Sequence, residues 1–217
     1  MADKQSTNAA ERAKRANSQR RAGLPPIDAT AAHAVGERLS RESLPTPVRL
    51  TPRVNSGELT PASEVDRDRQ RLERRLMEFG VVERAIEGDG NCQFRAISDQ
   101  IYGSQQHHGL VRAACVEQLL LGRERYKDYV IAENFEEYVE KMAKDGEWGD
   151  HVTLKATADA LGTDINLITS FPSSAIICVL SEPTEATVLE TIDLDNKPSL
   201  WLSFWAEIHY QSLTLMT

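Results

Sequence analysis

The hydrophobic pattern of the chain changes near Gly162, and this change limits the possible folds more than any other feature of the sequence. Before it, apolar residues recur at the spacing of amphipathic helices, whereas after it β-branched and aromatic residues form short runs between turn residues. The later runs are DINLITS, AIICVL and SLWLSFWAEIHYQSL. Helices followed by strands predict an α+β fold in which the sheet is mostly C-terminal.

Five helices are expected before this point, because apolar residues repeat there every three or four positions. They cover about 63–79, 92–102, 108–121, 135–142 and 151–161, and a short extended segment is expected at 81–86. Gly80, Gly103 and Gly162 directly follow three of these helices, where a left-handed glycine commonly ends a helix. Asp150 is a candidate N-cap of the last one.

Residues 1–62 differ from the rest of the chain in composition. They are rich in Ala, Arg, Ser, Thr and Pro and lack aromatic residues, so they bury too little apolar area to offset the entropy of ordering. We therefore expect a disordered tail at 1–62 and one domain at 63–217. Within that domain, Trp201 and Trp205 are expected to pack in the core or in a site wall.

Charge is also divided unevenly along the chain. Residues 1–53 hold ten Lys and Arg against five Asp and Glu, whereas residues 54–217 hold fifteen against twenty-eight. An acidic domain is unsuited to a nucleic-acid groove, which needs clustered positive charge beside the phosphates. We expect no nucleic-acid partner, and a basic protein partner suits the charge better.

Cysteine use and hydropathy indicate the environment. Cys92, Cys115 and Cys178 give an odd count without a C-x-x-C pair, so neither a disulfide framework nor a zinc site is expected. No run approaches the roughly 18 apolar residues of a membrane helix, and the N-terminus lacks the apolar core of a secretory signal. We expect a protein of the cytoplasm or nucleus, which are reducing compartments, with no membrane, metal or cofactor.

The sequence GDGNC, residues 88–92, places a thiol at the start of a predicted helix. Unpaired N–H groups and the helix dipole favour negative charge at such a position, which predicts a lowered pKa for Cys92. The flexible loop before it can aim amides inward, as an oxyanion hole requires. The same residues also fit an ordinary turn, in which Asn91 caps the helix and Cys92 is a small buried hydrophobe.

A nucleophilic cysteine needs a base, so the histidines decide between these interpretations. His33 lies in the predicted tail, and His107, His108 and His151 lie at helix starts, where capping or surface roles are expected. His209 differs because it lies in an alternating strand, where a sheet can hold its ring against a helix end. A hydrogen-bonded structural role for this histidine stays open.

Five separated blocks of the sequence together resemble one known family. They are GDGNCQFRAISDQIYG, HHGLVRAACVEQL, EWGDHVTLKATADAL, DINLITS and LSFWAEIHYQSL. In sequence, order and spacing they are similar to the ovarian tumour (OTU) family of cysteine proteases, and most to its plant-type branch, over about 64–213. The resemblance implies a papain-like fold and an isopeptidase that cuts after the C-terminal glycine of ubiquitin, with ubiquitin, polyubiquitin chains or ubiquitinated proteins as partners.

The resemblance also implies roles for individual residues. Cys92 is similar to the family nucleophile, His209 to its general base, and Asp89 to the aspartate of the oxyanion loop. Trp148 and Gly149 resemble the loop that lines the approach to the site. Their neighbours, Glu147 and Asp150, are expected to face the basic C-terminal tail of ubiquitin.

Gln211 departs from the family pattern. Members usually carry Asn or Asp two residues after the histidine, where the side chain orients the imidazole. The amide oxygen of glutamine can still accept from the ring N–H, and another acceptor can take that role instead. The third catalytic member is therefore open, while the Cys92–His209 pair is not affected.

Three other functions are compatible with the sequence. The first is a ubiquitin-binding module of the same fold in which Gln211 weakens catalysis. The second is a protease for a ubiquitin-like modifier, and the third is a structural protein with an incidental GDGNC motif. For the protease we expect a monomer.

Overall fold

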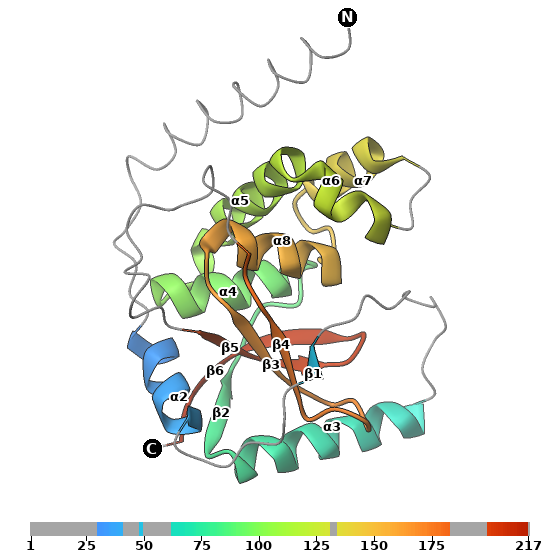
Figure 1. Ribbon diagram of the computed structural model, residues 1–217. Helices are drawn as coiled ribbons and strands as arrows, with labels where there is room; N and C mark the ends of the chain where they lie inside the picture. The colour runs from blue at the N-terminus through green and yellow to red at the C-terminus, as the bar shows by residue number, and fades with distance from the viewer. Residues whose placement is uncertain (1–29, 41–47, 50–61, 131–133, 183–198, 217) are drawn as a thin grey trace, which may run out of the picture.

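A computed structural model of the chain describes residues 30–40, 48–49, 62–130, 134–182 and 199–216 (Figure 1). Its helical segments are α2 (Thr30–Ser40), α3 (Ala62–Glu78), α4 (Cys92–Tyr102), η1 (Gln105–His107), α5 (His108–Leu121), α6 (Arg123–Tyr126), η2 (Lys127–Tyr129), α7 (Phe135–Met142) and α8 (His151–Leu161). The five helices that the sequence pattern predicts correspond to α3, α4, α5, α7 and α8. Gly103 and Gly162 end α4 and α8 in the left-handed conformation, as expected.

The strands form one mixed sheet. They are β1 (Val48–Arg49), β2 (Val81–Arg84), β3 (Ile165–Thr169), β4 (Ile176–Val179), β5 (Leu200–Trp205) and β6 (His209–Leu215), in the order β1-β4-β3-β5-β6-β2. β1 with β4 and β3 with β5 are parallel pairs, and the other neighbours are antiparallel. Four of these six strands follow Gly162, so the α+β prediction with a mostly C-terminal sheet is confirmed.

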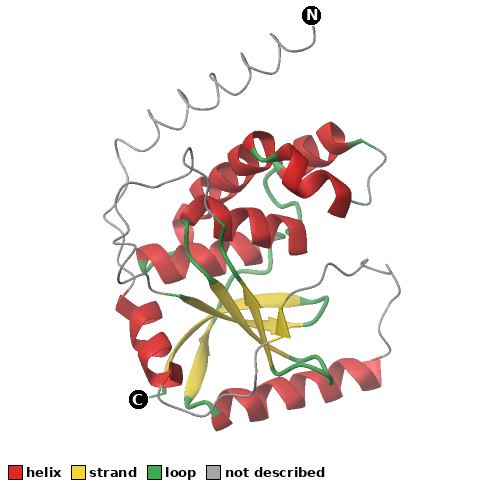
Figure 2. Cartoon of the chain, in the orientation of Figure 1, coloured by secondary structure: helices red, strands yellow, loops and turns green. Residues whose placement is uncertain are grey.

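Helices cover both faces of the sheet (Figures 1 and 2). Side chains alternate between the faces, as a pleated strand requires: Leu167 joins the core beneath α4, α5 and α8, while its neighbour Ile168 joins the core against α2 and α3. Trp201 is buried in this second core and Trp205 packs against it, as expected of both. The sheet therefore lies between two helical layers.

The helix α2 lies inside the segment predicted to be disordered. Its side chains Val35 and Leu39 are fully buried in the core that α3 shares with the sheet. This apolar pair, four positions apart, forms one helical stripe, and the low aromatic content of 1–62 hid it from the composition argument. The disorder prediction is wrong for 30–40 and 48–49, and its other parts, 1–29, 41–47 and 50–61, lie outside the described residues.

β5 and β6 form a hairpin that places His209. The sequence pattern suggested that Ile208 and His209 share one strand, but Ile208 lies in the turn, where its N–H donates to the carbonyl of Trp205 at 2.9 Å. Glu207 takes a φ of +60° in this turn. No Gly, Pro, Asn or Asp marks this turn, so the usual turn residues do not predict it. His209 is consequently the first residue of β6.

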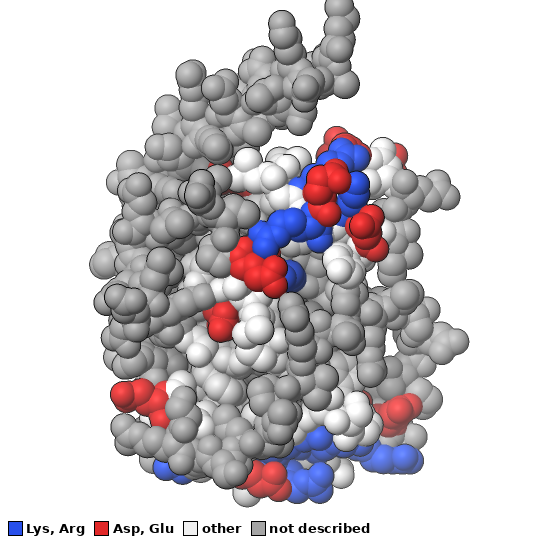
Figure 3. Space-filling view, viewed as in Figure 1, with Lys and Arg blue, Asp and Glu red and all other residues white. Residues whose placement is uncertain are grey.

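Acidic and basic side chains alternate on the outer surface over α3 and near α6 (Figure 3). Ion pairs there include Arg74 with Glu78 at 3.9 Å and Arg125 with Glu182 at 3.0 Å. Within the described ranges, no helix is both long enough and apolar enough to cross a membrane.

Candidate active site

Cys92 is the first residue of α4 and lies where this helix meets the start of β6. Its side chain packs against the larger core, and the backbone N–H groups of Tyr210, Gln93 and Cys92 itself lie near enough to the sulfur to favour the thiolate and so to lower the pKa of the thiol. Tyr210 directly follows His209 in β6. The fold therefore brings the thiol to the strand position beside the candidate base.

The environment of Cys92 shifts its pKa in a direction that the sequence did not predict. Burial raises the pKa of the thiol above its usual value, and the three backbone N–H groups oppose this only in part. The negative charge of Asp89 also favours the neutral thiol. The prediction of a lowered pKa is wrong for the free protein, because desolvation at this site outweighs the helix N-terminus.

His209 makes a specific contact with the main chain. Its Nε2 lies 3.2 Å from the carbonyl oxygen of Ile86. Because a carbonyl can only accept, Nε2 carries the hydrogen in this contact, and in the neutral ring the lone pair is on Nδ1. This tautomer is the one that a base acting through Nδ1 requires.

Gln211 lies on the same face of β6 as His209 but binds elsewhere. Its Oε1 accepts from the N–H of Ile86 at 2.9 Å, and its Nε2 donates to Glu83 at 3.4 Å. Of the two possibilities that the sequence left open for His209, the structure has the second, in which another acceptor binds the ring N–H. That acceptor is the Ile86 carbonyl.

Asp89 organises the loop in front of the thiol. Its carboxylate accepts from the backbone and side chain of Asn91 at 3.1 and 3.0 Å, and from Nη2 of Arg95 at 2.6 Å. The Arg95 hydrogen bond, followed by those of Asn91, holds the pKa of Asp89 well below its usual range. Asp89 therefore remains a carboxylate that fixes the loop, and its direct role in catalysis stays a prediction.

Gly90 is at the tightest point of this loop. Its φ is +85°, and a Cβ at this position would lie 1.9 Å from the carbonyl oxygen of Gly146. Only glycine allows both the conformation and the approach of the two backbones. The loop before Cys92 and the loop before α8 are thus in direct contact.

Two buried side chains join these loops. The Oδ1 of Asn91 accepts from Arg112 at 2.7 Å and from the N–H of Gly146 at 3.0 Å. Arg112 also donates to the carbonyls of Met142 and Glu147, at 2.8 and 2.7 Å. The sequence pattern does not predict this role, because an arginine in an amphipathic helix is usually on the surface.

The predicted approach loop lies beside α4. Trp148 is 62% exposed, which is unusual for so large an apolar side chain. At Gly149, a Cβ would lie 2.4 Å from Oε1 of Gln93, so the loop passes directly over the residue after the nucleophile. These positions agree with a surface beside the thiol, and their contact with substrate remains a prediction.

The two acidic neighbours differ in what they contact. Glu147 forms an ion pair with Lys141 at 3.2 Å and is partly exposed. Asp150 is the N-cap of α8, as predicted: its Oδ1 accepts from the N–H groups of Val152 and Thr153 at 2.9 Å and from the hydroxyl of Tyr138 at 2.8 Å. A role in ubiquitin binding stays a prediction for both residues, and Asp150 also has a structural role as this N-cap.

Comparison with known proteins identifies the family. The model of the family described as "OTU-like cysteine protease" matches residues 87–212, which include Cys92 and His209. The chain belongs to this family.

Within the described ranges, no group of three His, Cys, Asp or Glu side chains could hold a metal ion.

Similar proteins occur in Arabidopsis thaliana. OVARIAN TUMOR DOMAIN-containing deubiquitinating enzyme 9 is 43% identical over 82% of this chain and 48% of its own length. Enzyme 12 of the same series is 42% identical over 83% of this chain and 75% of its own length. The chain therefore spans about half the length of the first relative.

A solved structure, that of the OTUD1 OTU domain, shares the fold. It aligns with a TM-score of 0.57 at 22% identity, over 70% of this chain and 97% of the OTUD1 chain. At this identity the similarity concerns the fold alone.

Proposed function

We propose that the chain is a deubiquitinating cysteine protease that hydrolyses the bond after the C-terminal glycine of ubiquitin. The observation that carries the proposal is that Cys92 starts α4 beside the start of β6, where His209 lies, while Nε2 of His209 contacts a carbonyl. This arrangement supports Nδ1 as the base. Relatives about 42% identical that are named deubiquitinating enzymes support ubiquitin as the substrate.

The reaction begins with proton transfer from the Cys92 thiol to Nδ1 of His209. The thiolate attacks the carbonyl carbon of the terminal glycine, and the C–N bond then breaks as the imidazolium gives its proton to the leaving lysine amine. Water next attacks the thioester, with His209 taking its proton. The sulfur leaves and regains a proton, so the enzyme returns to its starting state.

The raised pKa of Cys92 is consistent with these reaction steps. In the free protein the thiol stays largely neutral, and transfer to His209 produces an ion pair beside the N–H groups of Tyr210, Gln93 and Cys92. Backbone amides near Asp89 and Cys92 are the expected oxyanion donors. Removing one donor of an oxyanion hole typically costs a hundredfold to a thousandfold in rate, about 3 to 4 kcal/mol.

Substrate recognition is proposed for the loop at 147–150. Trp148 offers exposed apolar surface, and Glu147 offers negative charge to the basic C-terminal tail of ubiquitin. We expect the protein to act as a monomer. We also expect it in the cytoplasm or nucleus, because these reducing compartments keep a catalytic thiol reduced.

The test is cleavage of di-ubiquitin by wild type and Cys92→Ala, with substrates carrying ubiquitin-like modifiers in parallel. The proposal expects cleavage by wild type and none by the variant. Equal cleavage by both would refute the assignment of Cys92. Cleavage of another modifier in place of ubiquitin would refute ubiquitin as the substrate. Binding of ubiquitin without cleavage would indicate a binding module.

A further inference from the structure

The imidazole of His209 is held by a main-chain carbonyl, although the family pattern leads one to expect a side chain. Building on the proposed protease function, we propose that the third catalytic element of this chain is the carbonyl of Ile86. Gln211 and Gln105 are then positioning residues: Gln211 binds the segment 85–87 from the sheet, and Gln105 binds it from η1. Neither glutamine touches a reacting atom in this arrangement.

Gln211 provides the clamp from the sheet. Its Oε1 accepts from the N–H of Ile86 at 2.9 Å, while its Nε2 donates to the carboxylate of Glu83 at 3.4 Å. Glu83 is itself fixed, because Arg69 donates to it at 2.7 Å and the hydroxyl of Ser203 at 2.6 Å. The amide of Gln211 therefore has a defined orientation, and the length of glutamine lets it bind the backbone beside the histidine.

Gln105 provides the clamp from η1. Its Oε1 accepts from the N–H of Glu87 at 3.1 Å, and its Nε2 donates to the carbonyl of Ala85 at 3.4 Å. The N–H of Glu87 and the carbonyl of Ile86 belong to the same peptide group. A hydrogen bond to that N–H polarises the group and makes its oxygen a better acceptor for the ring of His209.

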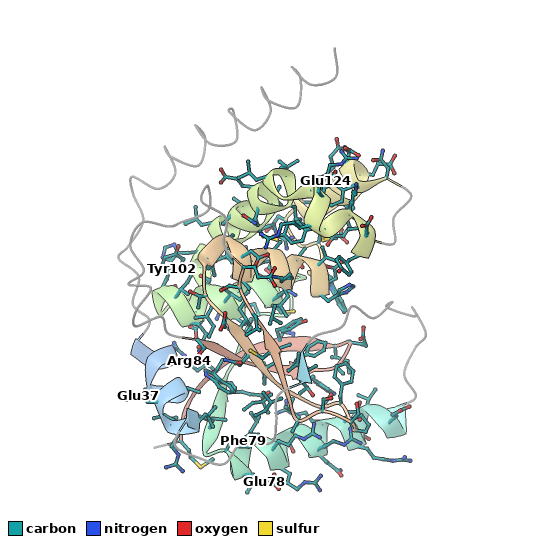
Figure 4. The ribbon with its side chains drawn as sticks, in the orientation of Figure 1. Glu37, Glu78, Phe79, Arg84, Tyr102 and Glu124 are labelled. Atoms are coloured by element: carbon teal, nitrogen blue, oxygen red, sulfur yellow. The ribbon has the colours of Figure 1, made fainter. Side chains whose placement is uncertain are left out.

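Two further contacts fix the segment 85–87 in the fold. Arg84, labelled in Figure 4, closes β2 and pairs with Asp99 of α4 at 3.2 Å. The side chain of Ile86 is buried in the larger core at 8% exposure. The carbonyl is thus anchored to α4, which also carries Cys92, and to β6, which carries His209.

The chemical consequence concerns the charged ring. When His209 takes the proton of Cys92, the positive imidazolium donates more strongly to its acceptor, and a fixed carbonyl dipole stabilises it without moving. Loss of either clamp lets the peptide rotate away. The ion pair then forms less readily, so the thiolate appears only at higher pH.

The test compares Gln211→Met and Gln105→Met with Gln106→Met. Methionine keeps the length of glutamine and removes its hydrogen bonds, and Gln106 is the exposed neighbour that serves as the matched control. Three quantities are measured on the full chain: the melting temperature, kcat and KM on a fluorogenic ubiquitin substrate, and the rate of iodoacetamide alkylation of Cys92 against pH, resolved by mass spectrometry.

Each clamp variant is expected to lower kcat about threefold to tenfold with KM within twofold, the effect of losing roughly one net hydrogen bond. The acid limb of the alkylation profile is expected to move up by about half a unit to one unit. Gln106→Met should match wild type in both readouts. A purely structural role would lower the melting temperature and leave the acid limb in place.

The proposal is overturned if a folded clamp variant keeps kcat within twofold of wild type and leaves the acid limb unmoved. Should Gln211→Met fail to fold, Gln105→Met decides, because Gln105 binds the segment from η1 and is not part of the sheet. The alkylation profile needs no ubiquitin. A wild type that is inactive on ubiquitin would therefore refute the proposed function, while the clamp is still tested separately.

Discussion

Gly90→Ala tests how closely the loop before Cys92 must approach the loop before α8. The added Cβ would lie 1.9 Å from the Gly146 carbonyl oxygen, whereas ordinary contact begins at 3.4 Å, so the two backbones must separate by about 1.5 Å. The φ of +85° adds strain of about 1 to 2 kcal/mol for a non-glycine residue. Because Cys92 is two residues away, a displacement of about 1 Å is expected to cost about a hundredfold in kcat/KM.

Gly103→Ala is the matched control for this change. Gly103 has a similar φ of +64°, but a Cβ there would meet nothing within 4 Å. This variant should therefore lose only the strain, about 1 to 2 kcal/mol in the free energy of unfolding, and keep its activity. Gly90→Ala should lose about 2 kcal/mol more, the scale of a steric clash inside a packed region.

The assay is denaturant unfolding of both variants together with kcat/KM on a fluorogenic ubiquitin substrate. The contact argument would be refuted if the two variants lost equal stability and Gly90→Ala kept full activity. A second result would also contradict the reasoning: the two variants lose equal stability, and only Gly90→Ala loses activity. The loop would then move without resistance from Gly146.

Three further predictions concern the same site. Arg112→Met should lower both stability and kcat, by about 2 to 4 kcal/mol and at least tenfold, because the carbonyls of Met142 and Glu147 lose this donor and Oδ1 of Asn91 loses one of its two donors; calorimetry and steady-state kinetics check this. Trp148→Ala should raise KM severalfold and leave kcat within twofold, since the side chain is exposed and outside the proton-transfer chain; an unchanged KM would contradict it. The depressed pKa of Asp89 predicts that wild type is more stable than Asp89→Asn, with the full difference present above the ordinary Asp pKa of about 3.9. This difference should disappear as the pH falls through the lower pKa that Asp89 has in the folded protein. A difference that grows on acidification would refute this.

The fold was largely predictable because its elements follow simple patterns. α5, α7 and α8 begin and end where the apolar stripes do, and Asp150 and Gly162 mark the two ends of α8. α2 was not predicted because only two apolar residues, Val35 and Leu39, form its buried stripe, and two residues in a polar segment do not make a recognisable helical pattern. Short stripes become visible only when the surface that buries them is known.

The site was predictable only in part, for a related reason. Residue type and setting single out Cys92 and His209 as candidates, and the resemblance to a family combines them. The same reasoning does not single out the Ile86 carbonyl, because main-chain acceptors are present at every residue and only the fold selects one of them. Arg112 was likewise hidden, since burial of a charged residue depends on acceptors that come from distant segments.

The most direct test of the central claim uses ubiquitin with a C-terminal electrophile. Wild type should form a single covalent adduct that mass spectrometry maps to Cys92, and His209→Ala should form it at least a hundredfold more slowly, because general-base assistance contributes on that order. The buried Cys115, in which burial raises the thiol pKa to about 12, should remain unmodified. An adduct on another cysteine, or a rate that does not depend on His209, would contradict the account.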